Sequence, residues 1–138
     1  HLTALAPVIV RNIDRLSLRR LNAELAKGGL ERRFAWVTEN IAEAVGRELS
    51  RPLPRPLAQR YRRAAVVLSM FKDFVTSHTQ DASQTERAVS LDLLDPTIGS
   101  LRTSREVAKM SSAISKRWGI VTDLQPEDFV EALRAANV

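Results

Sequence analysis

Arginine is the side chain in this sequence best suited to chemistry, because its guanidinium group forms forked hydrogen bonds with phosphate and carboxylate. Arg11, Arg15 and Arg19 recur at intervals of four, so a helix reaching back to Arg11 would carry them as one basic ridge. A second group surrounds a proline-rich stretch. A surface of this kind can follow a nucleic-acid backbone. The candidate nucleic-acid-binding residues, for DNA or RNA, are Arg11, Arg15, Arg19, Arg20, Arg51, Arg55, Arg60, Arg62 and Arg63.

The charge balance agrees with such a surface but does not require it. Residues 1–65 hold thirteen Lys and Arg against six Asp and Glu, a net charge of +7, whereas residues 66–138 carry −2. The simpler interpretation is a solvated face with local ion pairs to Glu24, Glu31 and Glu48. Aromatic residues that could stack on single-stranded bases are also scarce in this half. Nucleic-acid binding is therefore our second hypothesis.

Trp36 breaks the pattern of the helix expected around it. On a helical wheel it lies about 120° from the apolar stripe of that helix, among charged neighbours that include Arg32 and Arg33. Either the first helix of the chain covers this indole, or the indole is exposed and marks a contact site. The second alternative makes Trp36, Arg32 and Arg33 candidate residues of a protein interface, for a partner or a second copy.

The other reactive side chains form no pattern typical of an enzyme. There is no cysteine, and the two histidines are His1 and His78, so we expect no metal site. Four acidic residues near the last helix match neither a calcium loop nor a di-metal pattern: Asp123, Glu127, Asp128 and Glu131. No glycine-rich phosphate loop occurs. We therefore expect no cofactor and no catalytic residue, and a protein that is not an enzyme.

Two further stretches suggest recognition motifs, but a structural role explains each one better. Residues 51–57, RPLPRPL, are similar to a proline-rich ligand of SH3-type domains, yet Leu57 stands where the second proline of the usual pair would fall. A short, stiff link between antiparallel helices is the better explanation. Residues 103–121 can be aligned with a helix-turn-helix. No glycine marks a turn there, so we expect one helix from Ser104 to Trp118, ended by Gly119.

Periodicity and capping signals predict helices along most of the chain. The expected ranges are 13–27, 30–49, 57–77, 84–94, 104–118 and 126–136. Residues 6–10 are either a short extended segment or the lead into the first helix, and Pro7 argues against a helix beginning earlier. Ser83 with Glu86, and Thr103 with Glu106, are capping-box patterns.

The stretch from Leu57 to Ser77 is the one we expect at the centre of the fold. Its apolar residues recur at steps of three and four, and Val66, Met70 and Phe74 extend them beyond one stripe. A helix that is apolar on most sides needs neighbours on most sides. We therefore predict an all-α fold, a compact bundle of five or six helices around a central buried helix at about 57–77, in a single domain over residues 1–138.

Composition narrows the function without naming it. Hydrophobic residues make up 44% of the chain and charged residues 27%, as in ordinary soluble domains. No apolar run has the length of a membrane span, and no basic region of a signal peptide is visible, so we expect a cytoplasmic protein with no membrane contact. His1 in place of Met suggests a tag remnant or a fragment of a longer protein. The first functional hypothesis is a non-enzymatic helical module that assembles with a protein partner or with itself, in a regulatory or nucleoprotein complex.

Overall fold

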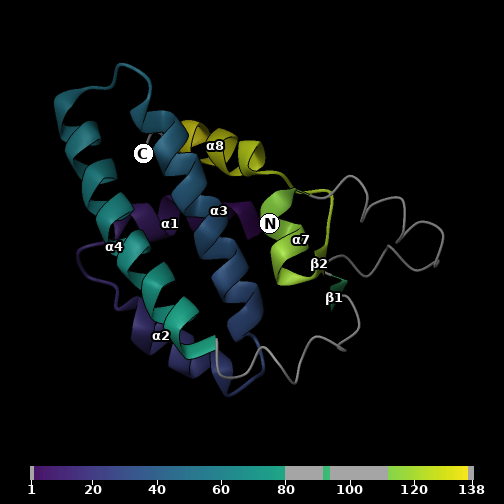
Figure 1. Cartoon of the computed structure of the whole chain (residues 1–138). Helices are drawn as coiled ribbons and strands as arrows, with labels where there is room; N and C mark the ends of the chain where they lie inside the picture. The colour runs from purple at the N-terminus through teal and green to yellow at the C-terminus, as the bar shows by residue number, and fades with distance from the viewer. Residues whose placement is uncertain (1, 80–91, 94–111, 137–138) are drawn as a thin grey trace.

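The chain folds into helices that pack around one core, as drawn in Figure 1. The computed structural model describes residues 2–79, 92–93 and 112–136. The elements in these ranges, in chain order, are η1 (Leu2–Ala4), α1 (Leu5–Arg11), α2 (Leu18–Ala26), α3 (Glu31–Leu49), α4 (Arg55–Thr79), β1 (Asp92–Leu93), α7 (Ala113–Trp118), β2 (Ile120–Val121) and α8 (Pro126–Ala135). The predicted all-α fold class is confirmed, with six α-helices in the part of the chain described.

The helix at the centre is α3, and not the stretch 57–77. Every residue from Phe34 to Ile41 is buried, which covers more than two full turns of α3 without a solvent-facing side. Such a helix needs neighbours all round, and α2, α4, α7 and α8 supply them. The sequence pattern of α3 is amphipathic, and its polar side chains suggested a solvent-facing side. The central position of α3 was therefore not predicted.

The long helix predicted at 57–77 exists as α4 and packs along α3 on one side only. Its buried residues recur at steps of three and four: Tyr61, Ala64, Leu68, Phe71 and Val75. Val66 and Met70 are 60% and 63% exposed on the opposite side. The prediction of a central helix was wrong because it counted these two residues as core. The link at residues 50–54 is short and α3 and α4 run antiparallel, as the three prolines indicated.

The N-terminal segment forms two helices where one was predicted at 13–27. Helix α1 begins at Leu5, and Pro7 lies in its first turn, where no backbone N–H is needed for the helix. The Asn12 side chain donates to the Val8 carbonyl (2.8 Å) at the end of α1. Ser17 then starts α2, because its hydroxyl accepts from the Arg20 N–H (3.3 Å). Gly29, with φ of 72°, ends α2 as predicted.

The C-terminal segment from Ser112 to Ala136 consists of two short capped helices, α7 and α8, with the short strand β2 between them. Helix α7 begins at Ala113, and its cap Ser112 has an extended backbone, so the prediction of one continuous helix through Ser112 was wrong. Its end at Gly119, in the left-handed conformation, is confirmed. β1 pairs with β2 in parallel, which contradicts the helical end predicted at Asp92 and Leu93. The remainder of the predicted helix 84–94, both capping-box patterns and residues 104–111 lie outside the described residues. Helix α8 closely matches its prediction at 126–136.

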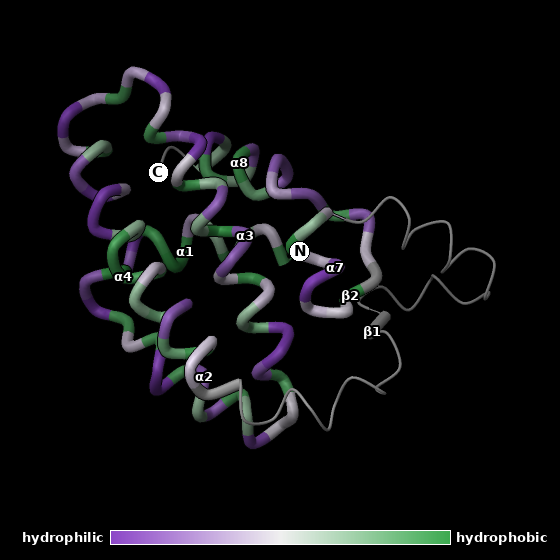
Figure 2. Tube along the Cα trace, in the orientation of Figure 1, coloured by the Kyte–Doolittle hydropathy of each residue, from purple (hydrophilic) through white to green (hydrophobic). Residues whose placement is uncertain are grey.

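Hydropathy follows this arrangement. In Figure 2 the tube is green along much of α1, and purple segments follow the outer side of α4. Aromatic rings join the layers: Phe34 of α3 meets Phe71 of α4 edge to face, with centroids 5.5 Å apart. Such pairs contribute about 0.5–1.5 kcal/mol beyond the apolar area they bury. The core therefore lies on both sides of α3.

Candidate functional site

Trp36 is a core residue. It is fully buried and meets Phe129 of α8 edge to face, with ring centroids 5.9 Å apart. Its Nε1 donates to the Ser115 hydroxyl at 2.8 Å, so residues of α7 and α8 both contact the indole. The candidate interface at Trp36 is therefore corrected: no part of this indole reaches solvent. Arg32 and Arg33 are half-buried and already make interactions within the chain.

The nine candidate arginines do not form one surface. The break at residues 12–17 separates Arg11 and Arg15 from α2, so the predicted ridge through Arg19 does not exist. Four of the nine have partners within the chain. Arg11 donates to the Ala136 carbonyl (3.3 Å), and Arg63 pairs with Asp14 (2.7 Å). Arg19 lies 4.4 Å from the Phe74 ring centre, and Arg51 pairs with Glu48.

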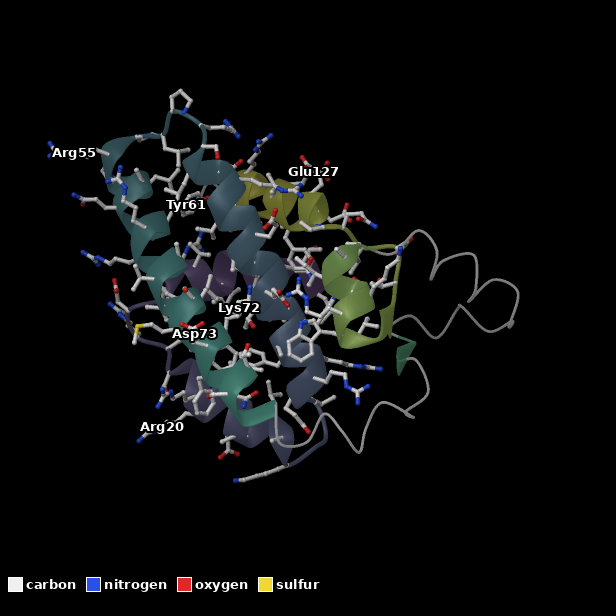
Figure 3. All side chains as sticks on the ribbon, in the orientation of Figure 1. Arg20, Arg55, Tyr61, Lys72, Asp73 and Glu127 are labelled. Carbon is white, nitrogen blue, oxygen red and sulfur yellow. The ribbon has the colours of Figure 1, made fainter. Side chains whose placement is uncertain are left out.

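The side chains of the other five make no ion pair or hydrogen bond with any residue in the described ranges: Arg15, Arg20, Arg55, Arg60 and Arg62. Figure 3 shows Arg20 and Arg55 at the outer side of α2 and α4, with their side chains in solvent. Local ion pairs account for only part of the basic character. Glu48 pairs with Arg51 as that interpretation expected, whereas Glu24 pairs with Lys27 (3.0 Å) instead of an arginine.

A buried carboxylate organises the end of the bundle where α3, α4 and α8 meet. The Glu48 side chain is 4% exposed. Its Oε1 accepts from the Nε and Nη2 of Arg134 (3.0 and 2.9 Å) and from the Nη1 of Arg51 (3.1 Å), and its Oε2 accepts from the same Nη1 (3.2 Å). The hydrogen bond to Glu48 raises the pKa of Arg134 above its usual value. No local pattern pointed to Arg134, because it lies 86 positions from Glu48.

Tyr61 faces this carboxylate from α4. Its side chain is fully buried, and its hydroxyl has no hydrogen-bond partner among the described residues. Burial, and then the charge of Glu48, raise the pKa of Tyr61 to about 12. Arg51, Arg60 and Arg134 oppose that rise, so all three guanidinium groups are near enough to act on the phenol. Arg51 and Arg134 both donate to Glu48, and Arg60 precedes Tyr61 on α4, so the three arginines lie at the same end of the bundle.

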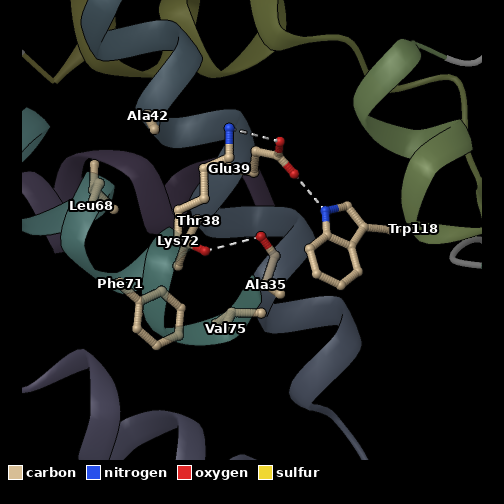
Figure 4. Close-up of a pocket in the computed structure, with 9 residues that line it drawn as sticks. All are labelled: Ala35, Thr38, Glu39, Ala42, Leu68, Phe71, Lys72, Val75 and Trp118. Carbon is tan, nitrogen blue, oxygen red and sulfur yellow. Dashed lines mark hydrogen bonds and ion pairs between the residues drawn. The ribbon is translucent and has the colours of Figure 1, made fainter. Parts of the chain in front are cut away.

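Glu39 has a comparable role between α3, α4 and α7, as Figure 4 shows. Its carboxylate accepts from the indole N–H of Trp118 and from Arg117, and it pairs with Lys72 at 3.6 Å. Beside it an open groove of about 350 Å³ runs between the same helices. The charged side chains along this groove are paired with one another or with Arg47. The groove therefore presents no unpaired charge to a ligand.

The outward side of α4 combines apolar and cationic side chains, and we call it the α4 outer face. It comprises Arg55, Arg62, Arg63, Val66 and Met70, all exposed. The two apolar residues lie one turn apart, and the three arginines share their side of the helix. Asp73 is the one acidic residue of α4. Asp73 follows Met70 by about one turn on this side, so the α4 outer face is an exposed apolar pair with arginines towards its N-terminal end and one carboxylate beyond it.

Two of the four acidic residues near α8 have structural roles. The carboxylate of Asp128 accepts from the backbone N–H of Gln125 (2.7 Å), and Glu127 pairs with Arg47 (3.0 Å). Within the described ranges, no cluster of His, Asp and Glu could hold a metal ion. None of the helices in these ranges combines the length and hydrophobicity needed to cross a lipid bilayer.

Comparison with protein-family models, with curated proteins and with solved structures finds no match to this chain. Its functional assignment therefore rests on the surfaces described above.

Proposed function

We propose that this protein is a non-enzymatic helical interaction module that docks an acidic, amphipathic helix of a protein partner on the α4 outer face. The observation that carries the proposal is the exposure of Val66 and Met70 on one side of a helix whose opposite side is fully packed. Neighbouring exposed apolar side chains with a polar rim are typical of contact surfaces. Methionine adapts its shape to a partner at little cost.

Charge complementarity determines the kind of partner. Three arginines share the α4 outer face with the apolar pair, and among the described residues only Arg63 of the three has a carboxylate partner, Asp14. A second copy offering the same face would bring like charges together, which disfavours association. An acidic helix with its own apolar stripe would cover Val66 and Met70 and pair with the arginines around them. A regulatory or nucleoprotein complex is the setting in which we place such a module.

The experiment uses a fluorescent synthetic peptide with leucines on one helical face and glutamates elsewhere. We expect its anisotropy to rise on titration with the protein, and the affinity to fall when salt is added. The variant Val66→Ser/Met70→Ser should bind at least about tenfold more weakly, since two apolar contacts are lost. Val8→Ser is the matched control, because Val8 is a 52% exposed valine on α1.

Two results would contradict docking at this face: equal affinity of Val66→Ser/Met70→Ser and the parent protein, or equal binding of a scrambled peptide of the same composition. Light scattering at two protein concentrations tests assembly with a second copy. Concentration-dependent dimers that disappear in the same variant would replace the acidic partner with a copy of the chain.

The second candidate function is nucleic-acid binding. It is favoured by the arginines that lack partners in the described part, in particular Arg15, Arg20 and Arg55. Gel shifts with mixed DNA and RNA at two salt concentrations test it, since phosphate contacts weaken steeply with salt. Absence of any shift at low salt would remove this function. If a gel shift were seen and the variant Arg15→Gln/Arg20→Gln abolished it, nucleic-acid binding would become the first candidate function in place of protein docking.

A further inference from the structure

The arginine cluster at Glu48 is separate from the α4 outer face and resembles a prepared anion site. Buried Glu48 fixes two guanidinium groups by four hydrogen bonds, so their orientation is set before any ligand arrives. Both side chains remain about half exposed, 47% for Arg51 and 49% for Arg134. The cost of ordering two long side chains is therefore already met within the fold.

Each guanidinium keeps unused donors. Arginine has five N–H groups in a planar fork. Glu48 occupies the Nη1 of Arg51 and the Nε and Nη2 of Arg134. The Nε and Nη2 of Arg51 and the Nη1 of Arg134 donate to no acceptor in the described part of the chain. Donors on partly exposed groups whose other edge is fixed are available to an external anion.

The charge of the cluster exceeds what Glu48 can neutralise. Arg60 is exposed, has no partner among the described residues, and acts on the same Tyr61 hydroxyl as Arg51 and Arg134. Three guanidinium groups therefore face one buried carboxylate. Glu127 and Glu131 also act on Arg134. Glu127 shares Arg47 with Glu43, so Glu127 and Glu131 both oppose an anion at Arg134.

We propose that Arg51, Arg134 and Arg60 form a binding site for a dianionic phosphate group, such as that of a phosphate monoester. A tetrahedral phosphate accepts forked hydrogen bonds from two guanidinium groups. These groups attract a dianion more strongly than a carboxylate or a backbone phosphodiester, each of which carries a single charge. The site needs no contribution from Val66 or Met70, so it can be present whether or not the α4 outer face docks a partner.

The test follows the arginine Nε–H resonances of the whole protein by NMR while inorganic phosphate is added at constant ionic strength. We expect saturable shifts at Arg51 and Arg134, similar shifts with sulfate, and weaker ones with acetate. Arg51→Gln should lower the affinity by about tenfold, the loss of one charge-assisted contact. Glu131→Gln, an exposed change, should raise the affinity, which no effect of unfolding can imitate.

Arg60→Gln keeps all four hydrogen bonds of Glu48 and should weaken binding without altering the fold. Arg62→Gln is its matched control, because Arg62 is also an exposed arginine of α4 without a partner among the described residues. Equal affinities of Arg60→Gln and the parent protein, or shifts no larger than those with chloride, would overturn the site. A DNA oligonucleotide lacking terminal phosphates separates the sources of phosphate. If it shifted these resonances as strongly as phosphate, the preference for a dianion would be overturned.

Discussion

The indole nitrogen of Trp36 and the hydroxyl of Ser115 are 79 positions apart in the chain and 2.8 Å apart in space. Both residues are fully buried. The Ser115 hydroxyl also accepts from the Ser112 hydroxyl (3.1 Å), which in turn caps α7 through the Ser115 N–H. One short chain of hydrogen bonds therefore joins the N-terminus of α7 to the centre of α3.

Ser115→Ala should destabilise the protein by about 1–3 kcal/mol, because the Trp36 N–H would remain buried without an acceptor. Urea unfolding followed by tryptophan fluorescence measures the change. Ser69→Ala is the matched control, since Ser69 is exposed on α4, and its effect should stay within about 0.5 kcal/mol. Equal midpoints for the two variants would show that the hydrogen bond contributes nothing to stability.

Glu48→Gln should cost about 1–3 kcal/mol, because the charged acceptor of two arginines is lost inside the protein. The half-exposed guanidinium groups can regain water, which keeps the loss below that of a fully buried pair. Glu43→Gln makes the same chemical change in a pair that is about half exposed, Glu43 with Arg47, and should cost less than about 1 kcal/mol. The prediction fails if the two variants unfold at the same urea concentration.

Tyr61 should make stability fall at alkaline pH. Its pKa in the folded protein is about 12, above the usual value of about 10. The folded state favours the neutral phenol, so this contribution is complete below pH of about 10 and is lost as pH rises towards 12. Tyr61 is the only tyrosine, so phenolate absorbance reports it directly. Tyr61→Phe should reduce the loss of stability between pH of about 10 and 12. If stability fell equally steeply with pH in the parent protein and the variant, the raised pKa of Tyr61 would not be its cause.

Two glycines should respond oppositely to alanine. Gly119 has φ of 66°, so Gly119→Ala should cost about 1–2 kcal/mol through backbone strain alone, since no atom lies within 4 Å of the added carbon. Gly46 lies inside α3 with equally open space, so Gly46→Ala should stabilise by about 0.5–1 kcal/mol. Thermal unfolding of both variants measures the two shifts, and shifts of the same sign would be inconsistent with this structure.

Local signals in the sequence predicted the elements better than their arrangement. Gly119 and Pro126 marked real helix boundaries, because caps depend on neighbouring residues only. The split between α1 and α2 was missed, since it depends on the Asn12 and Ser17 side chains bonding backbone groups that a continuous helix would also use.

The candidate sites were harder to predict, since burial and long-range pairing are tertiary properties. Trp36 was a candidate contact residue because its neighbours on the helical wheel are charged, yet Ser115 and Phe129, which contact it, lie in α7 and α8. Arg51 was correctly singled out within a basic group, but nothing in its sequence surroundings points to Arg134. The apolar residues on the outer side of α4 were noticed and taken for core.

Because α3 is buried without interruption from Phe34 to Ile41, an insertion in this helix should be tolerated far less than an insertion in the loop that follows it. Inserting one residue there would turn every later side chain of α3 by about 100°, so Glu48 would swing away from its arginines and Val45 from the interior. The loop at residues 50–54 could lengthen without such a rotation, because no packed helix passes through it. Natural or engineered insertions should therefore be tolerated in the loop between α3 and α4. Insertions within the buried part of α3 should prevent folding.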